Sequence, residues 1–210
     1  MIDKTHQILI ESLADEGKLM TLTEITFNGV EPDPSNRNTT DEYKQKMTDE
    51  IRASLLEKRS HMVNICMNLT NDFNKASVVR ASNAFLGKEV WMVGKRKFNR
   101  IGTVGTHHYE NMKHADDYKE LFAALIADGY TIYPVDNRPE YDPKVINEVV
   151  FPEKTAFLYG EEMLGLDDEV IEACNGDMIY IRQRGSVRSL NVAQAAAITM
   201  CFYDSQHVDF

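Results

Sequence analysis

The sequence has few cysteines, no long apolar run and no signal-peptide pattern, and each absence narrows the class of protein. Its three cysteines, Cys66, Cys174 and Cys201, lie in apolar surroundings without metal-ligand spacing, which predicts buried thiols in a reducing compartment. No stretch of about 18 apolar residues is available for a membrane-spanning helix. The N-terminus also lacks a basic segment followed by an apolar one. We therefore expect a soluble, cytoplasmic protein that does not bind membranes.

Basic residues are fewer than acidic ones, and they cluster in two segments of the sequence. With 23 Lys and Arg against 33 Asp and Glu, the formal net charge is −10, which argues against indiscriminate binding to a polyanion. The basic clusters are residues 95–100 and the group Arg182, Arg184 and Arg188. Such local patches can still hold one RNA strand.

From about residue 60 onward, short apolar strands alternate with helical segments. The expected strands are residues 62–67, 89–93, 131–134, 155–159 and 178–181. The expected helices are residues 76–86, 118–127 and 167–174, followed by a closing helix from residue 192. Continuous apolar strands separated by helices predict an α/β domain with a mostly parallel sheet and helices on both faces.

The first 60 residues predict a helical and irregular N-terminal extension. Residues 4–20 and 41–59 carry apolar side chains at helical spacing, whereas residues 28–40 are turn formers without an apolar period. We place the domain boundary near residue 60, so that residues 61–210 form the main domain.

A polar loop opened by Gly185 runs into an apolar helix at Val192, and such a junction suits a small ligand. Gly185 permits close backbone approach, and Ser189 can cap the helix. The free N–H groups of the first helical turn point at whatever lies in front of them. Taken alone, this segment indicates only a capped helix.

Two further segments change that interpretation. In residues 74–85, Asn74 and Arg80 stand six positions apart, and in residues 157–166 the pattern Gly-x-Glu-x-x-Gly follows an apolar strand. Together with the Ser-Leu-Asn-Val run at residues 189–192, and in the same order, these segments resemble the three signature motifs of the SpoU/TrmH family. That family comprises RNA ribose 2′-O-methyltransferases and belongs to the SPOUT superfamily. The resemblance covers roughly residues 61–205.

The resemblance, and not the strand pattern, implies a C-terminal trefoil knot in which the segment after Gly160 threads through a loop of the chain. It also implies an S-adenosyl-L-methionine cofactor, a homodimer and an RNA substrate, with tRNA favoured over rRNA. The positions expected to hold the cofactor, mainly by backbone groups, are Tyr159, Gly160, Ile181, Ser189 and Leu190.

The catalytic positions of the family correspond here to Asn74, Arg80, Glu162, Ser189 and Asn191. A guanidinium, with a pKa above about 12, is a poor general base. We therefore expect Arg80 to clamp a phosphate and orient the ribose hydroxyl, with an RNA phosphate as the base. Simpler interpretations remain open: Arg80 as an exposed helical residue and Glu162 as part of an acidic turn. Helix capping is both the simpler interpretation of Ser189 and Asn191 and a compatible role.

The candidate RNA-binding residues are the cations Lys95, Arg96, Lys97, Arg100 and Arg188. We expect residues 96–109 to form a flexible loop that grips phosphates, and an ordinary solvated loop is the alternative. The histidines at 107, 108 and 114 match no zinc spacing, so we expect no metal.

Two positions depart from the family pattern. Motif 3 usually reads Ile-Pro-Met before its glycine, whereas residues 181–183 are Ile-Arg-Gln, and motif 1 commonly has a small residue where this chain has Lys75. The leading function is S-adenosylmethionine-dependent methylation of an RNA ribose. The alternative, motivated by the acidic charge and the altered motif 3, is a knotted RNA-binding or regulatory module without efficient turnover. Methylation of a base nitrogen is a third, less favoured possibility.

Overall fold

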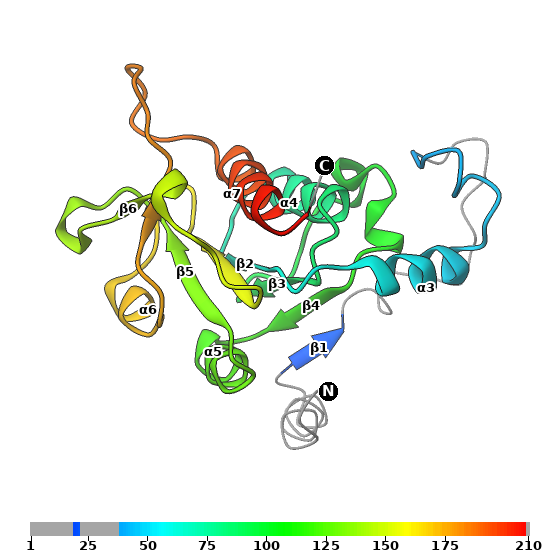
Figure 1. Ribbon diagram of the computed structural model, residues 1–210, viewed down its shortest axis with the longest axis horizontal. Helices are drawn as coiled ribbons and strands as arrows, with labels where there is room; N and C mark the ends of the chain where they lie inside the picture. The colour runs from blue at the N-terminus through cyan, green and yellow to red at the C-terminus, as the bar shows by residue number, and fades with distance from the viewer. Residues whose placement is uncertain (1–18, 22–37, 209–210) are drawn as a thin grey trace.

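The computed structural model describes residues 19–21 and 38–208, in which the strands form one sheet (Figure 1). The strand order is β1-β4-β3-β2-β7-β5-β8-β6. β1 pairs antiparallel with β4, and the other neighbours pair in parallel. The bounds are β1 Leu19–Thr21, β2 Val63–Met67, β3 Glu89–Val93, β4 Met112–Ala115, β5 Thr131–Val135, β6 Lys144–Val145, β7 Thr155–Tyr159 and β8 Ile179–Tyr180.

Helices cover both faces of this sheet. Their bounds are α3 Thr48–Lys58, α4 Asp72–Ala84, α5 Tyr118–Ala127, α6 Asp168–Glu172 and α7 Val192–His207. Short 3₁₀ turns are η2 Arg100–Thr103, η3 Thr106–His108, η4 Pro139–Tyr141 and η5 Ile146–Glu148. Figure 1 shows α4 and α7 side by side on one face, and α5 and α6 lie on the other.

Strand β3 illustrates why the sheet needs cover on both faces. All five of its residues are buried. Because successive side chains of a strand point to opposite faces, Met92 joins the core beneath α4 and α7 while Trp91 joins the core against α5. The prediction of an α/β domain with a mostly parallel, doubly covered sheet is therefore confirmed.

Helix bounds differ from the expected ones where capping residues decide them. α4 begins before the predicted residue 76, because the side chain of Asn71 accepts a hydrogen bond from the Phe73 N–H at 2.9 Å. α3 begins only at Thr48, where the Glu50 carboxylate accepts from the Met47 N–H at 2.7 Å. The sequence does not predict β4, whose Lys113 and His114 interrupt the apolar pattern.

The N-terminal predictions fall largely outside the described residues. Residues 4–18 of the expected helix and residues 28–37 of the expected linker are not described. Residues 19–21 are described, and they form a strand because their backbone pairs with β4. The expected end of that helix is therefore wrong.

The junction near residue 60 is packed against the main domain. Ile51 and Leu55 of α3 contact Tyr109 in a small core cluster. Arg59 Nη1 lies 2.9 Å from Glu110 Oε1 in a buried ion pair. Burial raises the pKa of the Glu110 carboxyl, and the neighbouring Arg59 opposes that rise. A division at residue 60 and the threading of the segment after Gly160 both stay predictions.

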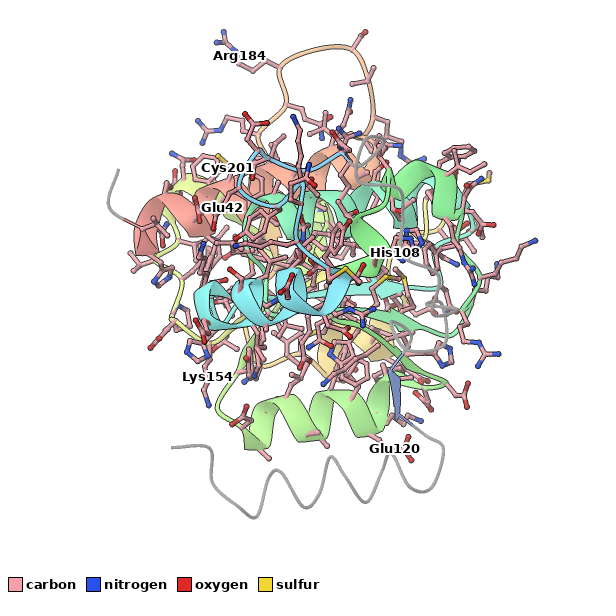
Figure 2. All side chains as sticks on the ribbon, turned by 90° about the vertical axis from the view of Figure 1, so that its right-hand side faces the viewer. Glu42, His108, Glu120, Lys154, Arg184 and Cys201 are labelled. Atoms are coloured by element: carbon pink, nitrogen blue, oxygen red, sulfur yellow. The ribbon has the colours of Figure 1, made fainter. Side chains whose placement is uncertain are left out.

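The cysteines only partly match expectation. Cys66 is buried, but Cys174 is half-buried and Cys201 is exposed on α7 (Figure 2). The prediction of three buried thiols is wrong for the last two, because α7 directs Ala196 and Met200 into the core and leaves Cys201 on its outer side. No helix within the described ranges has the length and apolarity to cross a membrane.

Candidate active site

A cavity of about 760 Å³ lies where three neighbouring parallel strands end. Val135, Tyr159 and Tyr180 are the last residues of β5, β7 and β8, and all three line it. Ligands of open α/β sheets bind at this carboxyl edge. The remaining wall comes from residues 136–140, 160–165 and 188–192, together with Ile181, Gln183 and Ala195.

The five positions expected to hold a cofactor all line this cavity: Tyr159, Gly160, Ile181, Ser189 and Leu190. The phenol of Tyr159 is committed to the core, because its hydroxyl donates to Asn64 Oδ1 at 3.0 Å and lies 2.7 Å from Thr199 Oγ1. Its backbone is therefore the part available to a ligand.

Gly160 opens a tight turn in which no larger residue fits. A Cβ atom built on Gly160 would lie 2.5 Å from the carbonyl carbon of Gly165. The turn is closed by two backbone hydrogen bonds between Glu161 and Gly165, of 3.0 and 2.9 Å. Gly165 itself has φ +75°, a conformation that favours glycine. The two glycines thus fold residues 160–165 into one wall of the cavity.

Three residues from the three sequence motifs form one hydrogen-bonded chain. Asn74 Nδ2 donates to Glu162 Oε1 at 3.0 Å, and Asn191 Nδ2 donates to Asn74 Oδ1 at 3.0 Å. The Asn191 Oδ1 atom accepts from the Ala193 N–H at 2.9 Å and so caps α7. Segments far apart in the sequence are therefore joined beside the cavity. We call Asn74, Glu162 and Asn191 the motif network.

Glu162 is anchored on both carboxylate oxygens. Its Oε2 accepts from the Thr70 N–H and hydroxyl, each at 2.9 Å, and its Oε1 accepts from the Asn71 N–H at 3.0 Å. Burial favours a higher pKa, but the hydrogen bonds from Thr70, Asn74 and Asn71 lower the pKa of Glu162 to about 2. Its stabilising contribution is full above the ordinary carboxyl pKa and disappears as the pH falls towards 2. Glu162 thus fastens the 160–165 turn to α4 and is poorly suited to accept a proton.

Arg80 lies next to the motif network but not in the cavity. It is exposed on α4 and lines a second hollow between α4 and α7, with Asn191 lining both spaces. Among the described residues, its guanidinium forms no hydrogen bond or ion pair within the protein. That leaves the group available to an incoming ligand.

Ser189 does not cap α7, contrary to expectation. The side-chain oxygen that reaches the first turn belongs to Asn191, two residues closer to the helix. Ser189 is exposed in the cavity wall. Within the part of the chain that is described, its hydroxyl has no hydrogen-bond partner, so it can meet a ligand.

The candidate RNA-binding cations are all exposed: Lys95, Arg96, Lys97, Arg100 and Arg188. Arg188 also lines the cavity, and Figure 2 shows Arg184 on a loop that projects from the body of the protein. The segment expected to form a flexible loop, residues 96–109, contains the short turns η2 and η3, in which Thr103 and His107 are buried. Its flexibility stays a prediction.

His107 packs inside this segment. Its Nδ1 atom lies 2.5 Å from Thr103 Oγ1. Burial, with smaller contributions from His108 and Arg100, lowers the pKa of His107 to about 4, so the ring is neutral at pH 7. In the described ranges, no group of three or more His, Cys, Asp or Glu side chains is arranged to hold a metal ion.

Sequence reasoning missed the loop that follows β5. Residues 136–140 line the cavity, and Arg138 pairs with Glu140 at 2.9 Å and with Asp168 at 2.8 Å. The place of these residues in the sequence could have indicated this, because charged residues directly after a buried parallel strand lie at the ligand-binding edge of the sheet.

Comparisons with known proteins agree with this geometry. A model of the SpoU rRNA Methylase family matches residues 61–201. The tRNA (guanosine(18)-2′-O)-methyltransferase from one strain of Thermus thermophilus is 28% identical over 154 residues, which are 71% of this chain and 77% of that enzyme. The match to its counterpart from another strain of the same species has the same extent.

Solved structures share the fold. The A. aeolicus TrmH/SpoU tRNA modifying enzyme superposes with a TM-score of 0.68 and 23% identity, covering 76% of this chain and 81% of that one. The SpoU methyltransferase AviRb from Streptomyces viridochromogenes gives a TM-score of 0.63 and 19% identity, covering 70% and 60%.

Proposed function

The chain belongs to the SpoU rRNA Methylase family, whose model matches more than half of it, and from that premise we propose that it methylates RNA at a ribose 2′-hydroxyl. The observation that carries the proposal is the motif network, which joins Asn74, Glu162 and Asn191 beside the large cavity. tRNA is favoured over rRNA, because the curated relative that matches 71% of the chain acts on tRNA.

S-adenosylmethionine suits the cavity. Its volume of about 760 Å³ lies within the range of small-molecule sites. Gly160 leaves room where a Cβ would meet backbone, and Tyr159, Ile181, Ser189 and Leu190 complete the wall. Arg182 of the altered motif 3 is exposed and pairs with Glu148 at 3.8 Å, outside the cavity wall. The bound cofactor would supply an electrophilic methyl group.

The protein's part in methyl transfer is orientation. An in-line displacement requires the ribose hydroxyl to be aligned with the methyl carbon. Arg80, beside Asn191, is placed to hold the adjoining phosphate and that hydroxyl. A guanidinium is a poor proton acceptor, and both carboxylate oxygens of Glu162 are already engaged by hydrogen bonds from Thr70, Asn71 and Asn74. We therefore assign the hydroxyl proton to an oxygen of the adjoining RNA phosphate, which passes it on to water.

A homodimer is part of this proposal. The second hollow is lined by Arg80 and by small residues of α4 and α7, namely Ser77, Ala81, Ala84, Ala193 and Ala197. A partner subunit seated there would place its own side chains beside Arg80. Light scattering of the full chain should give twice the monomer mass.

The test is incubation of the purified protein with methyl-labelled S-adenosylmethionine and either tRNA or rRNA, followed by digestion and mass spectrometry. A ribose-methylated nucleoside that is absent with Arg80→Ala supports the proposal. Methyl on a base nitrogen would replace it with the third possibility. Cofactor binding without any transfer would favour an RNA-binding module.

Asn191→Ser should separate the two roles of Asn191, which are to cap α7 and to donate a hydrogen bond to Asn74. Serine still caps α7, so the free energy of unfolding should stay within about 0.5 kcal/mol of the wild type, whereas Asn191→Ala should lose about 1 kcal/mol. Both variants remove the donor to Asn74, and we expect turnover to fall about tenfold in each. Denaturant titration and steady-state kinetics measure the two effects. Normal turnover in Asn191→Ser would remove the motif network from the function.

Replacing Lys97 and Arg100 together by alanine should weaken RNA binding in a salt-dependent way. Loss of two phosphate contacts lowers the slope of log affinity against log salt by roughly 1.4 to 1.8. Fluorescence anisotropy over a salt series measures this slope. The matched control replaces Lys58 and Lys119, exposed on α3 and α5, and should leave the slope unchanged. An unchanged slope in the Lys97 and Arg100 variant would show that this loop does not bind RNA.

A further inference from the structure

Lys75 is a lysine whose ammonium group is turned into the protein. The residue is 1% exposed and follows Asn74 directly on α4. Its Nζ donates to the carbonyl oxygens of Lys95 at 2.8 Å and Lys97 at 2.7 Å, and Asp72 lies 3.9 Å away. The side chain therefore ties α4 to the segment that carries the basic residues.

Burying an ammonium group costs free energy, so a buried lysine at this position needs an explanation. Burial disfavours the charged form and lowers the pKa of Lys75, and Asp72 opposes that effect. An ammonium group buried beneath a loop cannot contact a phosphate in solvent. Its influence on a ligand must act through the loop it holds.

The held loop has a fixed backbone and exposed charges. Before it, Gly94 has φ +76° and its N–H donates to Ala115 O at 2.9 Å. After it, Phe98 packs against the core and the Asn99 N–H donates to Asp72 O at 3.4 Å. Between these anchors Lys75 holds two carbonyls, so the side chains at 95–97 are directed into solvent.

We propose that Lys75 is a positioning residue that holds the loop 95–97 in the conformation that binds RNA phosphates. The inference rests on the proposed RNA substrate. A prearranged loop loses less conformational freedom on binding, so its contacts contribute more to affinity. Lys75 thereby acts on RNA without touching it.

The decisive variant is Lys75→Met, which keeps the length and apolar stem but removes the donor. We expect trypsin to cleave at residues 95–97 about tenfold faster, because the loop loses its central anchor. The KM for RNA should rise about tenfold, while kcat and the KM for S-adenosylmethionine stay within about twofold of the wild type. The control is Lys88→Met, which removes a half-buried lysine bound to the Tyr130 hydroxyl at 3.0 Å, away from the loop.

The separate effects on the KM for RNA and on kcat distinguish a positioning role from a general loss of stability. A purely structural role would lower the active fraction, and hence kcat, without changing the KM for RNA. That outcome, or unchanged cleavage by trypsin, would overturn the proposal.

A second measurement uses the wild-type protein and so does not depend on the variant folding. Acetylation of lysines, read by mass spectrometry, should leave Lys75 unmodified and label Lys95 and Lys97, and added tRNA should protect the latter two. Labelling of Lys75 at the rate of exposed lysines would show that its ammonium group is not held inside the protein, and would overturn the proposal. Absence of any RNA binding would instead refute the proposed function. The trypsin comparison would still test whether Lys75 holds the loop 95–97.

Discussion

Arg80→Lys lowers the turnover number by about 100-fold or more while leaving the affinity for S-adenosylmethionine within about twofold of the wild type. The first effect follows from shape, because lysine keeps the charge but loses the planar fork that holds a phosphate and a hydroxyl together. The second follows from position, because Arg80 lines the hollow between α4 and α7 and not the large cavity. Single-turnover methyl transfer and calorimetry of cofactor binding measure the two quantities.

Arg52→Lys is the matched control for this result. Arg52 lies on α3, where its guanidinium donates to the His108 carbonyl oxygen and pairs with Asp49, and it lines neither the cavity nor the second hollow. Its conversion to lysine should leave turnover near the wild-type value. If Arg80→Lys behaved in the same way, Arg80 would have no part in the chemistry.

How well the sequence predicted each strand and helix depended on how completely that segment is buried. The bounds of β3, β7 and α5 coincide with the predicted ones, because β3 and β7 are buried throughout and α5 has a clear apolar face. Strand β4 carries Lys113, whose ammonium pairs with Glu89 at 2.7 Å on the neighbouring strand. That partner is set by sheet register, which local pattern does not reveal.

The motifs predicted which positions lie together, but not what each side chain contacts. The five positions expected to hold a cofactor all line one cavity. The role of Glu162 depends on Thr70 and Asn71, which lie about 90 positions earlier in the chain and approach it only through the fold. The unusual Lys75 is visible in the sequence, but the two carbonyl contacts on which its proposed role rests appear only in the fold.

Gly160→Ala should lower the affinity for S-adenosylmethionine by about 100-fold, or about 2.8 kcal/mol, because the displaced turn no longer fits the bound cofactor. The added Cβ would lie 2.5 Å from the carbonyl carbon of Gly165 and 2.8 Å from the Leu166 nitrogen. These are backbone atoms, so the turn itself must move and carry Glu162 away from its anchors on α4. The free energy of unfolding should fall by about 2 kcal/mol as well.

Gly185→Ala is the control that gives this prediction its meaning. Gly185 lies in the loop before α7, and a Cβ built there meets no atom within 4 Å. Its substitution should leave cofactor affinity and stability unchanged, as measured by calorimetry and thermal unfolding. If Gly160→Ala bound the cofactor as tightly as Gly185→Ala, the 160–165 turn would not be part of the cofactor site. Loss of affinity in Gly160→Ala alone would show that the closeness of Gly160 to Gly165 shapes the cavity wall.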